Sequence, residues 1–106
     1  MPKYLVQGSY DGQGLQGLLK AGGTSRVDAA KQLVGEVGGT VEAFYFCFGR
    51  DDFVCILDIP SNVDMTTVAL SAMNNGEIRS RVTVLLTPEE VDRAAKNKEY
   101  FRPPGE

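Results

Sequence analysis

Residues 41–60 read VEAFYFCFGRDDFVCILDIP, and this stretch decides the fold of the chain. Aromatic, aliphatic and β-branched side chains dominate residues 41–48 and 53–59, a composition typical of β-strands. Between them, residues 49–52, GRDD, supply the glycine and the polar side chains of a tight turn. The sequence therefore predicts a β-hairpin at the centre of the chain.

Neither strand of this hairpin alternates cleanly between apolar and polar residues. Whatever register the strands adopt, both faces of the hairpin carry large apolar side chains that water would penalise. Helices of the same chain are expected to cover one face. We expect a second copy of the chain to cover the other, because an exposed apolar patch of that size is unusual on a monomer.

The hairpin is preceded by a predicted strand and two predicted helices. Residues 3–10 alternate as a strand does, with Tyr4, Val6, Gly8 and Tyr10 on one side. A short helix then ends at the glycine pair 22–23. A longer helix follows, for which Ser25 and Asp28 match a capping box, and it ends at the glycine pair 38–39.

Another helix and a last strand are predicted after the hairpin. Ser61 and Asp64 repeat the capping box, and a regular apolar stripe continues to a stop at residues 75–76, NG. The last strand spans residues 78–86. Thr87, Pro88 and Glu90 then combine an N-cap, a first-turn proline and an N3 glutamate, which predicts a short helix through about residue 96. Residues 100–105 should run extended, since their prolines cannot continue a helix.

The predicted order is strand, helix, strand, strand, helix, strand, with an added C-terminal helix. This order is that of a ferredoxin-like α+β sandwich, a four-stranded antiparallel sheet with its main helices on one face. We expect a single domain over residues 1–106, which is a usual domain size.

Four segments resemble the GYD-domain family: KYLVQGSYDGQGL, KAGGTSR, GGTVEAFYFCFG and VTVLLTPEEVDRAAK. The similarity spans nearly the whole chain and places the Gly, Tyr and Asp of the family name at Gly8, Tyr10 and Asp11, with Ser9 interposed. The resemblance implies a dimeric α+β barrel, and hence a homodimer or higher homo-oligomer. Similar barrels include cofactor-free monooxygenases, isomerases and proteins of no known chemistry, so no particular reaction is implied.

Composition narrows the classes of function. With 11 basic and 14 acidic residues the net charge is -3, and no run of like charge offers a footprint for nucleic acid or an anionic membrane. Neither a signal peptide nor a transmembrane run is visible, so we expect a cytoplasmic protein in which Cys47 and Cys55 are buried free thiols. Histidine is absent, which removes the commonest general base and zinc ligand.

The main candidate site lies on the first and last strands, which are neighbours in this fold. It comprises Gln7, Ser9 and Tyr10 with Arg79, Arg81 and Thr83. Guanidinium and phenol groups could bind a small anionic or enolisable molecule. The competing interpretation is that the arginines are solvated or pair with carboxylates of a partner subunit.

Three further patterns are weaker. Residues 22–26 lead into a helix whose N-terminus, with Arg26, could hold an anion, although a simple helix break explains them as well. The aromatic residues of 44–48 are interpreted as core or interface rather than as a ligand cavity. The carboxylates that come nearest to a metal site are those of Glu42, Asp51, Asp52 and Asp58. Strand alternation and exposure in a turn are enough to explain why acidic residues occur at these positions. We therefore expect neither a metal nor a cofactor.

Two hypotheses for the function remain open. The first is a non-catalytic module for small-molecule binding or for assembly, which the absence of histidine favours. The alternative is a cofactor-free isomerase, tautomerase or oxygenase in which Tyr10 and Arg79 assist. Whether the chain is an enzyme is not decided by its sequence.

Overall fold

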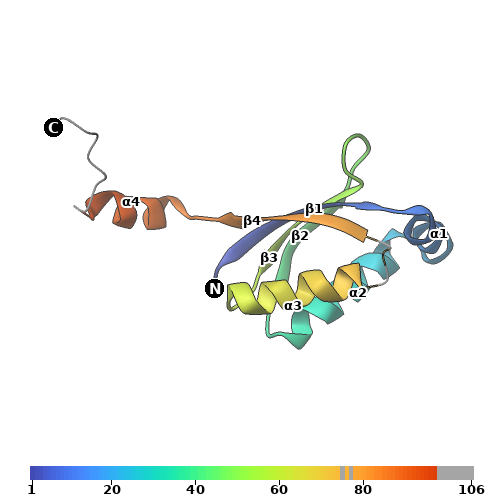
Figure 1. The fold of residues 1–106 in the computed structure, drawn as a ribbon, viewed down its shortest axis with the longest axis horizontal. Helices are drawn as coiled ribbons and strands as arrows, with labels where there is room; N and C mark the ends of the chain where they lie inside the picture. Colours follow the sequence, from blue (N-terminus) through green and yellow to red (C-terminus); the bar gives the residue numbers. More distant parts are fainter. Residues whose placement is uncertain (75, 77, 98–106) are drawn as a thin grey trace.

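The structure is a computed structural model, and it describes residues 1–74, 76 and 78–97. Its elements are β1 (Lys3–Tyr10), α1 (Gly12–Ala21), α2 (Gly23–Glu36), β2 (Thr40–Phe46), β3 (Phe53–Asp58), α3 (Asn62–Met73), β4 (Ile78–Leu85) and α4 (Pro88–Lys96). The strands form one antiparallel sheet in the order β2-β3-β1-β4, with α2 and α3 on the same side of it (Figure 1). The predicted ferredoxin-like α+β fold is confirmed.

The predicted central hairpin forms, but β2 ends at Phe46 rather than at residue 48, so residues 47–52 form the loop, and the pairing has one irregularity. The register passes from Val41 opposite Leu57 to Ala43 opposite Ile56, so Glu42 is an extra residue in a β-bulge. Beyond the bulge Phe46 pairs with Phe53, and the loop closes with a backbone hydrogen bond of 2.9 Å from the Cys47 amide to the Asp52 carbonyl. The bulge changes which residues of β2 face the helices, a detail that alternation alone does not predict.

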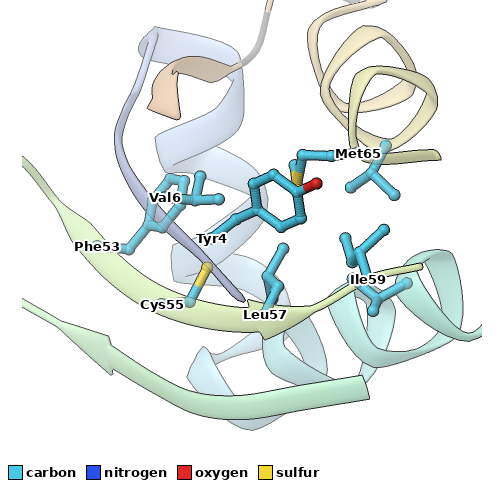
Figure 2. Close-up of a cluster of buried hydrophobic side chains, with 9 residues drawn as sticks. Tyr4, Val6, Phe53, Cys55, Leu57, Ile59 and Met65 are labelled. Carbon is cyan, nitrogen blue, oxygen red and sulfur yellow. The ribbon is translucent and has the colours of Figure 1, made fainter. Parts of the chain in front are cut away.

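The core lies between the sheet and its two main helices. Its buried members are Tyr4, Val6, Val34, Phe53, Cys55, Leu57, Ile59, Met65 and Val68. Figure 2 shows the Tyr4 ring at the centre of this cluster, with the side chains of Met65 and Leu57 around it. Only 1% of Tyr4 is exposed, and its hydroxyl donates a hydrogen bond of 2.6 Å to Asn62 Oδ1 at the start of α3. That bond satisfies a polar group which would otherwise be costly to bury.

The helix N-termini confirm two of the three predicted caps. Ser61 caps α3 by accepting from the Asp64 amide, and Thr87 and Glu90 form the full capping box of α4. The predicted box at Ser25 is wrong, because α2 already begins at Gly23 with Gly22 as its N-cap. Gly22 has φ +85°, which favours glycine, so the chain turns sharply there and starts the next helix at once.

The last helix, α4, lies apart from the rest of the molecule. It follows the end of β4 and extends beyond the sheet on the side of the N-terminus (Figure 1). None of its residues is buried. Residues 100–105, predicted to be extended, lie outside the described residues. Among the described helices, none combines the length and the apolar content needed to cross a membrane.

Candidate functional site

The sheet has a covered face, which packs against α2 and α3, and an open face on the other side. Alternation along each strand assigns the side chains to the two faces. The covered face carries the buried members of β1 and β3, whereas their neighbours Leu5, Val54 and Ile56 point to the open face. Tyr45, which pairs with Val54, is 69% exposed there. The two-sided apolar character predicted for the hairpin is therefore confirmed.

The ends of the open face are charged. At one end Lys3 Nζ lies 2.8 Å from Asp58 Oδ1 and 3.0 Å from Glu42 Oε1. These two contacts, the one to Asp58 first, raise the pKa of the Lys3 ammonium group. At the other end Arg81 Nη2 lies 2.8 Å from Asp51 Oδ2. The carboxylates considered as a metal cluster are thus divided between separate partners.

The open face brings together most of the candidate site predicted from the sequence. Ser9 pairs directly with Arg79 across β1 and β4, and Gln7 pairs with Arg81. Tyr10 does not join them. It lies on the covered face, where its ring centroid is 5.4 Å from that of Phe53. The predicted grouping is wrong in this respect, because consecutive residues of a strand point to opposite faces.

On the covered face, a cavity of about 180 Å³ lies beside the core, lined by residues of α2, α3 and the sheet. Apolar side chains from both helices and the sheet dominate its lining, including Leu33, Phe44 and Val68. Both helices contribute alanines there, namely Ala29, Ala30, Ala69 and Ala72. Because an alanine fills little of the space between a helix and a sheet, these positions account for the cavity.

Tyr10 and Arg26 give the cavity lining its phenol and its guanidinium group. Arg26 lies on α2 and lies against Gly17 of α1, where an added Cβ would approach Arg26 Nη2 to 2.6 Å. Burial raises the pKa of the Tyr10 phenol; Asp52 adds to that rise and Arg26 opposes it. The phenol is therefore protonated at neutral pH and is suited to donate a hydrogen bond.

Comparison with known families identifies the domain. The family model for the GYD domain matches residues 4–95, which extend from β1 into α4. The chain belongs to the GYD-domain family. No curated protein and no solved structure matches it. The resemblance noted in the sequence is thereby confirmed, and the cavity with both Tyr10 and Arg26 lies within the matched residues.

The residues assigned to the family name each have a structural position in this GYD domain. Gly8 passes against the Phe53 ring, and a Cβ there would also come within 2.8 Å of the Arg79 carbonyl oxygen. Tyr10 lines the cavity. Asp11 caps α1, its side chain accepting a hydrogen bond of 2.9 Å from the Gly14 amide. Gly8 and Asp11 thus hold the end of β1 and the start of α1 on either side of Tyr10.

The two cysteines of the GYD domain are free thiols in different surroundings. Cys55 lines the cavity, and burial raises the pKa of its thiol to about 11. It is therefore protonated at neutral pH and is a poor nucleophile. Cys47 is half-buried, and its thiol donates a hydrogen bond of 3.2 Å to the Asp51 carbonyl.

From the sequence, Arg26 is predicted only as part of a possible anion site at a helix N-terminus, and no local pattern connects it with Tyr10. The alternation of β1 contains the signal for half of the pair, since Tyr10 shares a side with Tyr4 and Val6. The position of Arg26 depends on how α1 packs against α2, which no local pattern specifies.

Proposed function

We propose that this GYD domain is a non-catalytic, cytoplasmic binding module that works as a homodimer. Its ligand would be a small, mostly apolar molecule with one polar or anionic end, held in the cavity between α2, α3 and the sheet. The observation that carries this proposal is the pairing of an apolar cavity of about 180 Å³ with Tyr10 and Arg26 in its lining.

The volume of the cavity favours a single ring. An apolar cavity of about 150 Å³ is enough to bind benzene. The cavity here, about 180 Å³, is suited to a ring with a small substituent. A carboxylate or hydroxyl on that ring would find a cationic donor in Arg26 and a neutral donor in Tyr10, and hydrogen bonds of this kind to a charged group are the stronger ones.

Binding is better supported than catalysis. Among the described residues that line the cavity there is no carboxylate. The Tyr10 phenol and the Cys55 thiol both have a raised pKa, so neither acts readily as a base or nucleophile near neutral pH. The free thiols agree with a reducing compartment such as the cytoplasm.

The open face supports the homodimer. Its centre is apolar, with Leu5, Val54 and Ile56, and its ends carry opposite charge. Lys3 is outnumbered by two carboxylates at one end, whereas Arg79 and Arg81 lie at the other, beside Asp51. If two open faces meet with their strands reversed, each basic end lies over the acidic end of the partner.

Benzoate and toluene are suitable probes of the cavity, and titration calorimetry gives the affinity for each. We expect both to bind the wild-type protein. Arg26→Gln should weaken benzoate about 10- to 100-fold, as expected for losing a hydrogen bond to a charged group, and leave toluene unchanged. Arg79→Gln, the same change on the open face, is the matched control and should alter neither affinity.

Two results would overturn the proposal. If neither probe binds, the cavity is a packing defect rather than a binding site. If Arg79→Gln weakens benzoate as much as Arg26→Gln does, or more, the binding site lies on the open face with Gln7 and Ser9.

A further inference from the structure

A second apolar space, which we call the end groove, lies at the end of the molecule that carries α1. Its volume is about 310 Å³. It is open to solvent, since Phe48 is fully exposed at 102% and Leu15 is 47% exposed. Large apolar side chains exposed together in this way are typical of a binding surface. The apolar lining comes from α1, from the start of α2 and from the end of β2 with its loop, namely Leu15, Leu18, Gly23, Phe46, Cys47 and Phe48.

The end groove begins where the cavity on the covered face ends. Tyr10 lines both of them. On the helix side, Gly23 lines the groove and Arg26 lines the cavity, and residues three apart are neighbours on a helix surface. On the sheet side, Phe46 lines the groove and Phe44 lines the cavity, and their ring centroids are 5.3 Å apart. The two spaces therefore adjoin along both walls, with Tyr10 at their junction.

We propose that the cavity and the end groove form one elongated site for a carboxylic acid that has an apolar part on each side of its carboxylate. The inference rests on the ligand-binding function proposed above and extends it to a class of ligand. In this site a ring occupies the cavity, the carboxylate lies at the junction beside Tyr10 and Arg26, and an alkyl chain continues into the end groove. Benzoate fills only the first part of such a site.

The charges near the junction set the order of these parts. Arg26 lies in the lining of the cavity. Asp52 lies in the lining of the groove, where its carboxylate accepts a hydrogen bond of 2.9 Å from the Tyr10 amide. Because like charges repel, Asp52 disfavours an anionic group in the groove. The part of the ligand that occupies the end groove is therefore uncharged, and the carboxylate stays on the side of Arg26.

Two isomeric acids test this order by titration calorimetry. The butyl chain of 2-phenylhexanoate is next to the carboxylate, whereas that of 4-butylphenylacetate is at the far end of the ring. Racemic 2-phenylhexanoate should bind roughly tenfold more tightly than phenylacetate or better, since each methylene group removed from water adds about two- to fourfold. The isomer 4-butylphenylacetate should bind less tightly than 2-phenylhexanoate, because a cavity of about 180 Å³ does not hold a ring and a butyl chain together.

Two residues of the lining show whether the chain enters the end groove. Leu15→Ala should weaken 2-phenylhexanoate about three- to tenfold and leave phenylacetate unchanged. Leu19 is 76% exposed on the same helix and is not among the described residues that line the groove. Leu19→Ala is therefore the matched control and should alter neither affinity.

The Cys47 thiol provides a second readout, because it lines the end groove and is only half-buried. Saturating 2-phenylhexanoate should slow the alkylation of Cys47 by N-ethylmaleimide, whereas saturating phenylacetate should not. Mass analysis of the digested protein separates the label on Cys47 from any label on Cys55, which is buried.

The outcomes separate this inference from the proposed function. If 2-phenylhexanoate binds no more tightly than phenylacetate or than its isomer, the elongated site is wrong and the cavity alone remains the binding site. Equal effects of Leu15→Ala and Leu19→Ala, or equal alkylation of Cys47 with both ligands, have the same meaning. If neither phenylacetate nor 2-phenylhexanoate binds, both proposals are wrong.

Discussion

Leu57 and Ile56 are adjacent aliphatic residues on β3, yet they lie in different environments. Leu57 points to the covered face and is 3% exposed, whereas Ile56 points to the open face and is only half-buried. The same contrast holds for Cys55 and Val54, the next pair along the strand. Apolar composition alone therefore does not determine burial. The covered face is completed by helices of its own chain, and in the homodimer proposed above the open face would be covered by the second copy.

The polar groups on the two faces also differ in burial and in charge. On the covered face the buried Tyr4 side chain donates its hydroxyl to one partner, Asn62 at the start of α3. On the open face the polar groups are charged, partly exposed and placed at the ends, as with Lys3 and Arg81. Charges at the rim of an interface contribute more to orientation than to affinity. The open face thus has the character of an interface, and the covered face that of a core.

The largest effect on stability is expected for Leu57 on the covered face, compared with its neighbour Ile56 on the open face. Leu57→Ala should lower the free energy of unfolding by about 2–5 kcal/mol, because it opens a cavity in the core. That loss should be the same at low and high protein concentration. Ile56→Ala should cost less in dilute solution, and its cost should increase with concentration, because it acts through association. Urea denaturation at two protein concentrations measures both, and equal, concentration-independent losses would contradict the assignment of the faces.

A smaller effect, on the pH dependence of stability, is expected from the Cys55 thiol on the covered face. The pKa of Cys55 is raised by burial from 9.0 to about 11. The folded protein therefore keeps its proton where the unfolded chain loses it, and stability falls as the pH rises from about 9 to 11. A shift of that size corresponds to roughly 2–3 kcal/mol.

Cys55→Ala isolates this contribution. The variant should be less stable than wild type at neutral pH because it loses packing, but its stability should fall less steeply over the alkaline range. Thermal unfolding between pH 8 and 11 gives both curves. Tyr10, whose pKa is also raised, still titrates in the variant and leaves a residual slope. Parallel curves would show that Cys55 is more accessible than its burial implies.

The smallest effect is expected on the open face. The ion pair between Arg81 and Asp51 joins a side chain that is 52% exposed to one that is 17% exposed. Exposed pairs contribute about 0–1 kcal/mol, so Arg81→Ala should change the stability of the dilute protein by no more than that. Added salt should reduce the difference further. A loss well above this range in dilute solution would show that Arg81 stabilises the subunit through more than this exposed ion pair.

Much of the fold follows from short-range patterns in the chain. Ser61 and Thr87 cap their helices because the side-chain oxygen of each accepts a hydrogen bond from the free backbone amide three residues later. The hairpin and its two apolar faces follow from composition and from the alternation of a strand. Such signals act over a few residues, so they are legible without knowledge of the rest of the molecule. Ser25 is the exception, since a glycine with positive φ allowed the helix to begin earlier.

The site required the tertiary structure. Grouping Tyr10 with Arg79 failed on alternation, which the sequence contains, but pairing Tyr10 with Arg26 depends on the packing of α1 against α2 at Gly17. The cavity depends on two helices that present alanines to the sheet at the same level. Local bonding therefore determined the elements, whereas the distances between elements far apart in the sequence, set by packing, decided what they enclose.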